Sequence, residues 1–283
     1  MGRTCYFHAG CPDGFGAAWA LWRAWGGEGR FTPRGHEDPV EAHRHAGELV
    51  VFVDIAAANR DLQALADVDA QLLVLDHHAS ARDRFQADPE LAGSLAAAGH
   101  HIHFDLDHSG AILAWNHFHP GMPAPELLRY VEDQDLWNWK LPSSEEVNAA
   151  IGSYPRDFES WELLSLRSAD DLAEEGAHIL RANRIEVERS LAGAHPIRLG
   201  SERAEAVNSR YVRAPIGHEL AKRAAFGRPW GVVYRTQAER VDASIYSIGD
   251  LDVARVAQRY GGGGHRNAAG FTVPLATWMK DFL

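Results

Sequence analysis

The sequence has few of the features that mark membrane proteins, secreted proteins or binders of long nucleic acids. Only two of its 283 residues are cysteine, Cys5 and Cys11. Two cysteines cannot cross-link a chain of this size, so we expect a reducing, cytoplasmic compartment. No apolar run reaches the roughly 18 residues that a transmembrane helix needs. The N-terminal residues show no signal-peptide pattern, and we expect no membrane partner.

Positive charge is also scarce. Lysine and arginine total 28 against 39 acidic residues, which leaves a formal net charge of -11. Such a balance disfavours binding to long duplex nucleic acid but allows a small phosphorylated substrate held through metal ions. Hydrophobic residues, in contrast, make up 46% of the chain. That content can form a packed core, and the length suits one large domain or two ordinary ones.

The first half of the chain alternates strand-like and helix-like segments. The predicted strands are residues 4–8, 48–56 and 70–78, and helices are predicted over 14–26, 59–68, 109–118 and 124–137. Continuous Val, Leu and Ile runs followed by helices indicate a parallel sheet that is buried on both faces. Ligands bind such sheets at the carboxyl ends of the strands. His8, Asp54 and the run Asp76, His77 and His78 all lie at those ends.

The second half has a different character. A charged stretch over residues 168–195 is predicted to form one long helix. Beyond it, strand-like runs at 196–209, 229–249 and 270–275 enclose helix-like segments at 217–226 and 252–261. We therefore predict an α/β protein of two lobes. Its parts are a parallel-sheet domain over 1–167, a linker helix over 168–195 and a smaller α/β domain over 196–283.

The polar residues at the predicted strand ends match what a two-metal hydrolase requires. Two divalent ions about 3.5–4 Å apart can clamp a nucleophile and phosphoryl oxygens between them. Manganese and magnesium prefer carboxylate oxygens, and imidazole shifts the preference toward manganese or a similar ion. The candidate ligands are His8, Asp13, Asp54, His77 and either Asp133 or Asp135.

Five motifs occur in an order that resembles the DHH-family phosphoesterases. They read HAGCPDGFGAA, VFVDIA, VLDHH, VEDQDLW and, far downstream, GGGGHRNAAGF. The last motif is similar to the signature of the DHHA1 domain, so the resemblance covers nearly the whole chain. It points to the branch that contains RecJ-like nucleases, oligoribonucleases and cyclic-dinucleotide phosphodiesterases. It argues against the family II pyrophosphatases, which carry a different second domain.

The resemblance implies a role for each matched residue. The implied metal ligands are His8, Asp13, Asp54 as a bridge, His77 and Asp133. Asp133 is preferred to Asp135 because the ligand in relatives lies four residues before an aromatic residue, here Trp137. The implied catalytic residues are Asp76, which orients His77, and His78 and His265, which face the substrate phosphate. The implied substrate contacts are the backbone N–H groups of Gly262, Gly263 and Gly264, followed by Arg266 and Asn267.

Two departures from the family pattern are visible. The first motif usually reads His-x-Asp-x-Asp-Gly, whereas this chain has Cys11 where the first Asp aligns. In an alternative register Asp13 is the first Asp and Phe15, which cannot bind a metal, takes the second position, so one carboxylate is missing in either case. A thiolate is a softer ligand, so Cys11 is a further candidate metal ligand that favours zinc or iron. The second departure is Tyr246, which replaces an arginine that many relatives carry. Loss of that arginine changes substrate choice, and a tyrosine can stack on a base. Trp137 and Trp139 are further candidates for base stacking.

The resemblance implies a divalent-metal-dependent phosphodiesterase that acts on oligoribonucleotides or on linear or cyclic dinucleotides through a metal-bridged hydroxide. Two ions are expected, with Mn²⁺ preferred and Mg²⁺, Co²⁺ or Zn²⁺ as alternatives. Two other functions stay open, a phosphomonoesterase of the 3′-phosphoadenosine-phosphate type and a catalytically weakened nucleotide-binding module. A homodimer is compatible with these features. The other histidines considered are expected on the surface, namely His43, His45, His100, His101, His103, His117 and His119.

Overall fold

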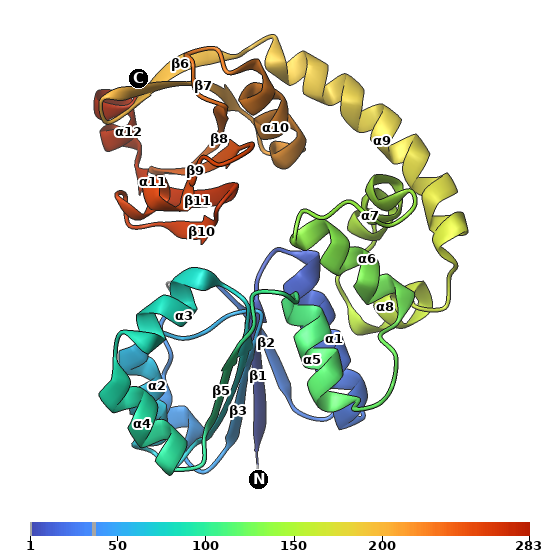
Figure 1. Cartoon of the computed structure of the whole chain (residues 1–283), viewed down its shortest axis with the longest axis vertical. Helices are drawn as coiled ribbons and strands as arrows, with labels where there is room; N and C mark the ends of the chain where they lie inside the picture. The colour runs from blue at the N-terminus through green and yellow to red at the C-terminus, as the bar shows by residue number, and fades with distance from the viewer. Residues whose placement is uncertain (1, 36–37) are drawn as a thin grey trace. The chain divides into compact units, whose positions relative to one another are not determined.

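The computed structural model describes residues 2–35 and 38–283. The chain divides into two compact units, Met1–Leu180 and Arg181–Leu283. Helix α9 (Ala169–Leu191) runs across this division and corresponds to the helix expected over 168–195 (Figure 1). The α/β class and the two-lobed organisation are thus confirmed, while the exact limits of the functional domains stay a prediction. Among the described residues, no helix combines the length and apolar character needed to cross a membrane.

The first unit is built on a parallel sheet. Its strands are β1 (Arg3–His8), β2 (Arg30–Arg34), β3 (Leu49–Val53), β4 (Gln71–Asp76) and β5 (His101–Phe104). They are ordered β2-β1-β3-β4-β5, and every neighbouring pair is parallel. The sequence pattern located β1, β3 and β4. It missed the two edge strands, because their sequences RFTPR and HIHF lack the continuous apolar run of a strand buried on both faces.

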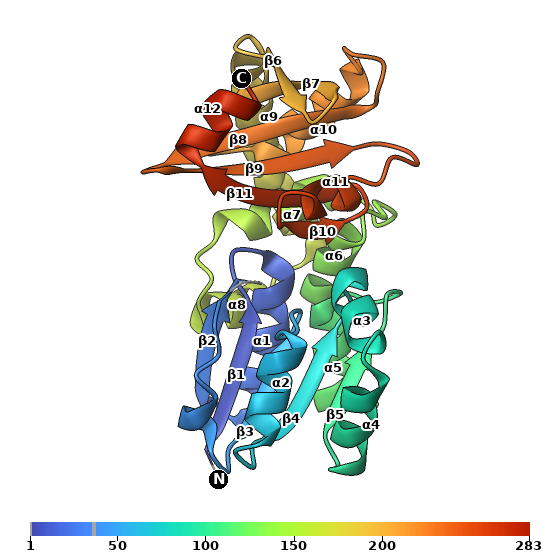
Figure 2. The ribbon, with the colours of Figure 1, turned by 90° about the vertical axis from the view of Figure 1, so that its left-hand side faces the viewer.

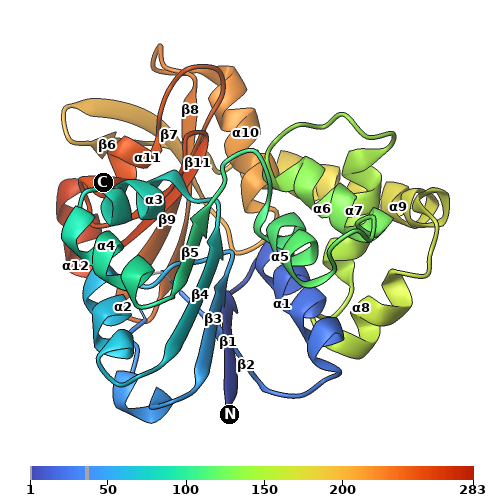
Figure 3. The same ribbon diagram turned by 60° about the horizontal axis from the view of Figure 1, so that its bottom comes forward.

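Alternate residues of the central strands pack into two separate cores. Val51 and Val53 of β3 face one core, whereas Val50 and Phe52 face the other. Helices α1 (Pro12–Trp25) and α5 (Gly110–Phe118) cover the first face, and α2 (Asn59–Ala66), α3 (Ala79–Gln86) and α4 (Pro89–Ala97) cover the second (Figures 1 and 3). Each strand is therefore buried on both sides, as the Val- and Leu-rich sequence predicts.

Three further helices extend the first core beyond α1 and α5. They are α6 (Glu126–Asp135), α7 (Ser144–Ser153) and α8 (Phe158–Leu164). Leu128 and Val131 of α6 and Trp161 of α8 are buried in the same core as α1. This packing fixes the C-terminal end of α6, which carries one of the acidic side chains described below.

Helix α1 begins at the carboxyl end of the sheet. Cys11 caps it, since the backbone N–H of Gly14 donates to Cys11 Sγ at 3.2 Å. Pro12 stands at the first helical position, where a missing N–H costs nothing. The helix ends at Gly26, whose left-handed φ of 66° suits glycine. These signals hold the Cys11–Asp13 turn next to the end of β1.

The second unit contains a mostly antiparallel sheet. Its strands are β6 (His195–Leu199), β7 (Glu202–Asn208), β8 (Trp230–Gln237), β9 (Arg240–Ser247), β10 (Gly263–His265) and β11 (Ala268–Pro274). The order is β10-β11-β9-β8-β7-β6, and β7 and β8 are parallel (Figure 2). Helix α10 (Arg213–Arg223) packs on one face through Ile216 and Leu220. Helices α11 (Ala254–Gln258) and α12 (Leu275–Asp281) contribute to the other core.

One local expectation was wrong. His45 was expected at the surface, yet it is buried. Its ring lies 2.8 Å from the hydroxyl of Tyr6 and 2.9 Å from a carboxylate oxygen of Glu48. These polar partners on neighbouring elements explain how an imidazole is accommodated there.

Candidate active site

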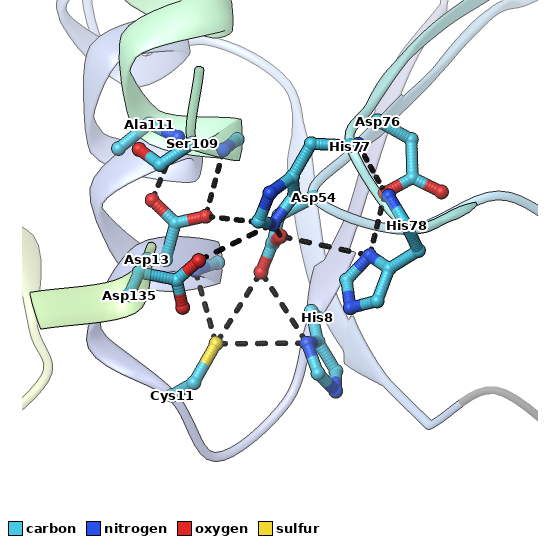
Figure 4. Close-up of polar contacts among 12 residues, drawn as sticks. His8, Cys11, Asp13, Asp54, Asp76, His77, His78, Ser109, Ala111 and Asp135 are labelled. Carbon is cyan, nitrogen blue, oxygen red and sulfur yellow. Dashed lines mark hydrogen bonds and ion pairs between the residues drawn. The ribbon is translucent and has the colours of Figure 1, made fainter. Parts of the chain in front are cut away.

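The carboxyl edge of the parallel sheet gathers polar side chains from three strands. His8 ends β1, Asp54 follows β3, and Asp76 ends β4 immediately before His77 and His78 (Figure 4). Because the strands are parallel, their carboxyl ends lie along one edge, and the side chains that follow them meet there. Cys11, Asp13 and Asp135 lie in the same cluster (Figure 4).

Asp54 occupies the middle of this cluster. It is 1% exposed, and its Oδ1 lies 3.0 Å from Nε2 of His77 while its Oδ2 lies 3.3 Å from Nδ1 of His8. Its φ of 57° is in the left-handed region, which Asp tolerates better than most residues. The backbone N–H of Asp54 donates to the carbonyl of Leu75 at 2.9 Å, so the turn stays tied to β4.

Asp13 is held by the N-terminus of helix α5. Its carboxylate accepts the backbone N–H groups of Gly110 and Ala111 at 2.7 and 2.9 Å. A Cβ on Gly110 would lie only 2.4 Å from Cβ of Asp54, so glycine is needed where the helix approaches the cluster. Ser109 caps α5, since its Oγ accepts the backbone N–H of Ile112 at 3.4 Å. Gly110 was not identified from the sequence, where the available signal was a glycine, a poor helix former, inside a predicted helix.

Burial and mutual repulsion set the charges of the acidic groups. Burial, followed by the charges of Asp54 and Asp135, raises the pKa of Asp13 well above its usual value. Burial and the charge of Asp54 raise the pKa of Asp135 to about 6. Burial also opposes ionisation of Asp54, but its hydrogen bonds with His77 and His8 prevail and hold the pKa of Asp54 well below its usual range. The cluster thus concentrates carboxylates that repel one another unless cations join them.

His77 lies between these carboxylates. Its Nε2 is 3.0 Å from Asp54 Oδ1, 3.5 Å from Asp13 Oδ2 and 3.4 Å from Asp135 Oδ2. Burial opposes a charge on this ring. The hydrogen bond to Asp54 and the charges of Asp13, Asp54 and Asp135 nevertheless raise the pKa of His77 to about 10. In the absence of other cations, a proton on His77 is therefore what compensates the acidic groups.

Asp76 orients His78 rather than His77, which corrects the role expected from the resemblance. Asp76 Oδ1 lies 2.7 Å from Nδ1 of His78 and accepts the backbone N–H of His77 at 2.8 Å. Burial opposes a charge on either group. The attraction between them still raises the pKa of His78 and lowers the pKa of Asp76. His78 is therefore stabilised in its protonated form, as a hydrogen-bond donor.

The preference for Asp133 over Asp135 is also corrected by the structure. Asp133 accepts the backbone N–H groups of Lys140 and Leu141 at 2.9 and 3.2 Å, so its carboxylate fastens the loop after α6. Asp135 is the residue that reaches the cluster. The two differ by two positions, or about 200° around a helix axis, so they cannot share a face. The two-residue spacing of Asp133 and Asp135 is visible in the sequence, but the sequence does not show which face of the helix is turned toward the cluster.

Cys11 is in contact with the cluster. Its Sγ lies 3.3 Å from Asp54 Oδ2 and 3.6 Å from His8 Nδ1. Since His8 Nδ1 and Asp54 Oδ2 are themselves 3.3 Å apart, these sulfur, nitrogen and oxygen atoms form a small triangle. Burial and the nearby charges of Asp54 and Asp13 raise the pKa of the Cys11 thiol well above its usual value. Such a thiol ionises only when a cation is added.

The donor atoms fit divalent metal ions. In each of two groups, one donor atom per residue lies within 4.8 Å of the others; the groups are His8, Asp54 and His78, and Asp13, His77 and Asp135. Asp135 Oδ2 is buried and forms no hydrogen bond, although His77 Nε2 lies 3.4 Å from it. Buried acceptors of this kind carry a large desolvation cost that a metal ion would relieve. Mixed carboxylate and imidazole donors suit Mn²⁺, Co²⁺ and Zn²⁺ better than a purely oxygen-ligated ion.

The glycine motif of the second unit forms the β10–β11 hairpin. The N–H of Gly262 donates to the carbonyl of Ala257 at 3.0 Å, so it cannot also bind a phosphate, contrary to expectation. A Cβ on Gly262 would lie 2.0 Å from the carbonyl oxygen of Gly270, and Gly264 has a φ of 136°. Gly263 is different, because a Cβ there would meet nothing within 4 Å. Packing thus explains Gly262 and Gly264 but not Gly263.

Arg266 and Asn267 bind the neighbouring loop. Arg266 Nη2 lies 3.0 Å from Asp250 Oδ1, and Asn267 Nδ2 donates to Ser247 Oγ at 3.0 Å. Both side chains hold the segment after β9, a role that the expected substrate contacts did not include. His265, the last residue of β10, pairs with Ala268 in the hairpin.

Tyr246 is packed rather than presented for stacking. A Cβ on Gly217 of α10 would lie 2.0 Å from Cδ2 of Tyr246, so the ring lies directly against the helix backbone. Burial raises the pKa of Tyr246. This placement is at odds with the expected contact between Tyr246 and a base, because one face of the ring is already covered.

Comparisons with known proteins were consistent with this architecture. Residues 219–283 match the DHHA1 domain family. The uncharacterized protein R106 of Acanthamoeba polyphaga mimivirus is 26% identical over 287 residues, covering 93% of this chain and 66% of that protein. The chain therefore spans just under two thirds of the length of this relative.

Two solved structures share the fold. The pGpG-specific phosphodiesterase PggH from Vibrio cholerae is 12% identical with a TM-score of 0.50, covering 99% of this chain and 96% of that one. An exopolyphosphatase-related protein from Bacteroides fragilis has the same identity of 12% and TM-score of 0.50, over 95% of this chain and 86% of its own. At such low identity these likenesses establish the architecture.

Proposed function

We propose that this chain is a DHH/DHHA1-type enzyme, namely a divalent-metal-dependent phosphodiesterase acting on short nucleotides. The DHHA1 match over residues 219–283 and the fold support this proposal. The observation that carries the proposal is the position of Asp54. Its two carboxylate oxygens face two different donor sets, His77 on one side and His8 on the other. A carboxylate shared in this way is what a pair of neighbouring cations requires.

The two donor sets differ in chemistry. We assign His8, Asp54 and Cys11 to one ion, and Asp13, His77 and Asp135 to the other with Asp54 shared. When bound, the ions would supply Lewis acidity toward phosphoryl oxygens and would lower the pKa of water at the site. Asp13 is oriented for metal binding because its carboxylate oxygens accept hydrogen bonds from two backbone N–H groups of α5.

His78 is assigned to the substrate. Asp76 fixes its Nδ1 at 2.7 Å and favours the protonated ring. The imidazolium can then donate Nε2–H to a phosphoryl oxygen and stabilise the negative charge that builds up there. Asp76 itself is buried and stays ionised, so it maintains the ring's orientation and charge without touching the substrate.

The preference for a nucleotide is supported by two tryptophans that follow Asp135 closely in the sequence, Trp137 and Trp139. Trp137 follows Asp135 by two residues and is 42% exposed. The rings of Trp137 and Trp139 form an edge-to-face pair with centres 5.1 Å apart. An exposed indole such as that of Trp137 can stack on a base, a contact worth about 1–3 kcal/mol. The pGpG-specific phosphodiesterase PggH has the same fold, so a linear dinucleotide is the first substrate to test.

The decisive experiment compares products from two substrates. The full chain is incubated with Mn²⁺ and either a linear dinucleotide such as pGpG or a 3′,5′-bisphosphate nucleoside. The proposal predicts mononucleotides from the dinucleotide. Release of inorganic phosphate from the bisphosphate alone would establish the phosphomonoesterase alternative. Nucleotide binding without turnover at any divalent metal would establish the weakened binding module.

Variants connect any turnover to the cluster. Asp54→Asn should lower the rate about a hundredfold or more, because metal-ion stabilisation of the transition state is worth several kcal/mol. Asp170→Asn is the matched control, since Asp170 is exposed at the start of α9. Equal rates for both variants would refute the assignment of Asp54.

A further inference from the structure

A second group of metal-binding side chains lies on the first unit. His101 and His103 are two residues apart on β5, so both point to the same face of the sheet. Helix α5 covers the face of this sheet that packs in the first core. His117 lies near the C-terminal end of α5. The helix starts at the active-site cluster with Gly110, seven residues earlier, which corresponds to about 10 Å of helix. We call these three residues the histidine triad.

Two of the three ring-to-ring distances are close to those of ligands to one ion. The ring centres of His101 and His117 are 5.7 Å apart, and those of His101 and His103 are 6.1 Å apart. Imidazole nitrogens bind zinc at about 2.0–2.1 Å, which places the centres of two coordinating rings about 5–6 Å from each other. All three side chains are exposed. They can therefore turn a nitrogen inward by rotation about their own side-chain bonds.

The surroundings favour a cation over an anion. The triad borders a cavity of about 360 Å³ that is also lined by Leu75, Leu113, Asp105, His108 and Asn116. Among the described residues that line it there is no lysine or arginine, and Asp105 adds a carboxylate. Burial, and then the neighbouring rings of His101 and His103, lower the pKa of His117. A neutral ring is a metal ligand, whereas an anion site would need the protonated form.

We propose that His101, His103 and His117 bind one divalent transition-metal ion of the zinc type, at a site separate from the candidate active centre. Imidazole donors select zinc, copper or nickel over magnesium or calcium, so the ion differs from the hard cations that carboxylates prefer. Two ligands from an edge strand and one from the helix that covers it would tie β5 to α5. Bound metal then stabilises the outer edge of the sheet by mass action.

Equilibrium dialysis against Zn²⁺ tests the site directly. The full chain carrying Asp54→Asn, which weakens the active centre, is compared with and without His103→Gln or His117→Gln. Each histidine change should weaken zinc binding by more than about tenfold. Even the loss of a residue that only hydrogen-bonds to a metal ligand typically lowers metal affinity about 10–100-fold. His43→Gln is the matched control, because His43 is an exposed histidine of the same unit and should leave binding unchanged. The same comparison in the wild-type background should show one zinc fewer per chain.

Two results would overturn the proposal. Zinc binding that is unchanged by both triad variants, or reduced equally by His43→Gln, would show that the triad is not a site. Loss of manganese-dependent dinucleotide hydrolysis in His103→Gln would place the triad in the active centre instead. If Cu²⁺ fills the site, electron paramagnetic resonance should show splitting by several nitrogens that disappears in the triad variants. Because hydrolysis should persist in those variants, failure of this proposal is distinguishable from failure of the proposed function.

Discussion

Asp54 shows how one residue combines backbone strain with charge. Its left-handed φ of 57° costs free energy that most folds avoid, of order 1 kcal/mol or more. The strain is maintained because the backbone is tied to Leu75 and the carboxylate lies between His8 and His77. We therefore assign Asp54 the central role in binding cations. The neighbouring residues determine which cations are preferred.

Cys11 is the residue that should distinguish this centre from one made of carboxylates and imidazoles alone. If its thiolate is a ligand, the Co²⁺-loaded protein should show a sulfur-to-cobalt charge-transfer band in the near ultraviolet. Cys11→Ser should lose that band while Cys5→Ser keeps it, because Cys5 is fully buried in the core. Cys11→Asp should shift preference from zinc toward manganese, since carboxylate is the harder ligand. A wild-type spectrum without the band would remove Cys11 from the ligand set.

Proton release should accompany metal binding. In the metal-free protein the pKa of His77 is about 10, so the ring is protonated at neutral pH, whereas a ligand nitrogen must be neutral. Metal affinity should therefore rise with pH up to about that value. Calorimetry of Mn²⁺ binding in two buffers of different ionisation enthalpy should find at least one proton released near pH 7.5. Cys11→Ser should release one proton fewer with Zn²⁺; an enthalpy independent of buffer would contradict both assignments.

At the scale of single elements, the periodicity of α6 separates two aspartates. Asp135→Asn should abolish binding of one metal ion while leaving the melting temperature nearly unchanged. Asp133→Asn should preserve the number of bound ions but destabilise the chain by about 1–3 kcal/mol, because two backbone N–H groups lose their charged acceptor. Metal titration and thermal unfolding of the two variants check this. The reverse pattern would restore Asp133 as the ligand.

A substitution at the start of α5 tests the site without replacing any of the proposed ligand residues. Gly110→Ala puts a Cβ 2.4 Å from Cβ of Asp54, so the carboxylate must shift. Mn²⁺ affinity should fall by about tenfold or more, comparable to the loss of a residue that orients a ligand. Gly93→Ala in α4 is the control, since a Cβ there meets nothing within 4 Å and alanine favours helix. Equal metal affinity in the two variants would show that α5 does not position Asp54.

Much of the site follows from strand periodicity, and the exceptions have physical causes. Parallel strands end along one edge, so His8, Asp54 and His77 could be brought together from the sequence alone. The choice between Asp133 and Asp135 could not, because it depends on which face of α6 is buried. Gly110 was missed for a similar reason. A glycine that is needed because another side chain packs against it can be recognised only when that side chain is known.

The second unit illustrates a different limit. The glycine motif predicted close approach of a substrate phosphate to the backbone, whereas the group that approaches Gly262 is the adjacent strand β11. Tyr246 likewise departs from its expected role because α10 has a glycine, Gly217, exactly where the ring lies. Such pairings of a small residue with a large one are set by tertiary packing. A single sequence does not reveal them.

At the scale of the whole molecule, composition restricts the substrate more than it restricts the chemistry. A net charge of -11 repels long polyanions, whereas a dinucleotide carries few charges, which bound cations can offset. We therefore keep short nucleotides as the proposed substrates. The DHHA1 match agrees with this proposal without specifying the base.

Anomalous diffraction from crystals of the full chain grown with Mn²⁺ would locate the bound ions. We expect two anomalous peaks beside Asp54, each in contact with one of its carboxylate oxygens. One peak should also contact Asp13, His77 and Asp135, and the other should contact His8. Peaks that lie elsewhere, or saturating manganese with none at Asp54, would contradict the account.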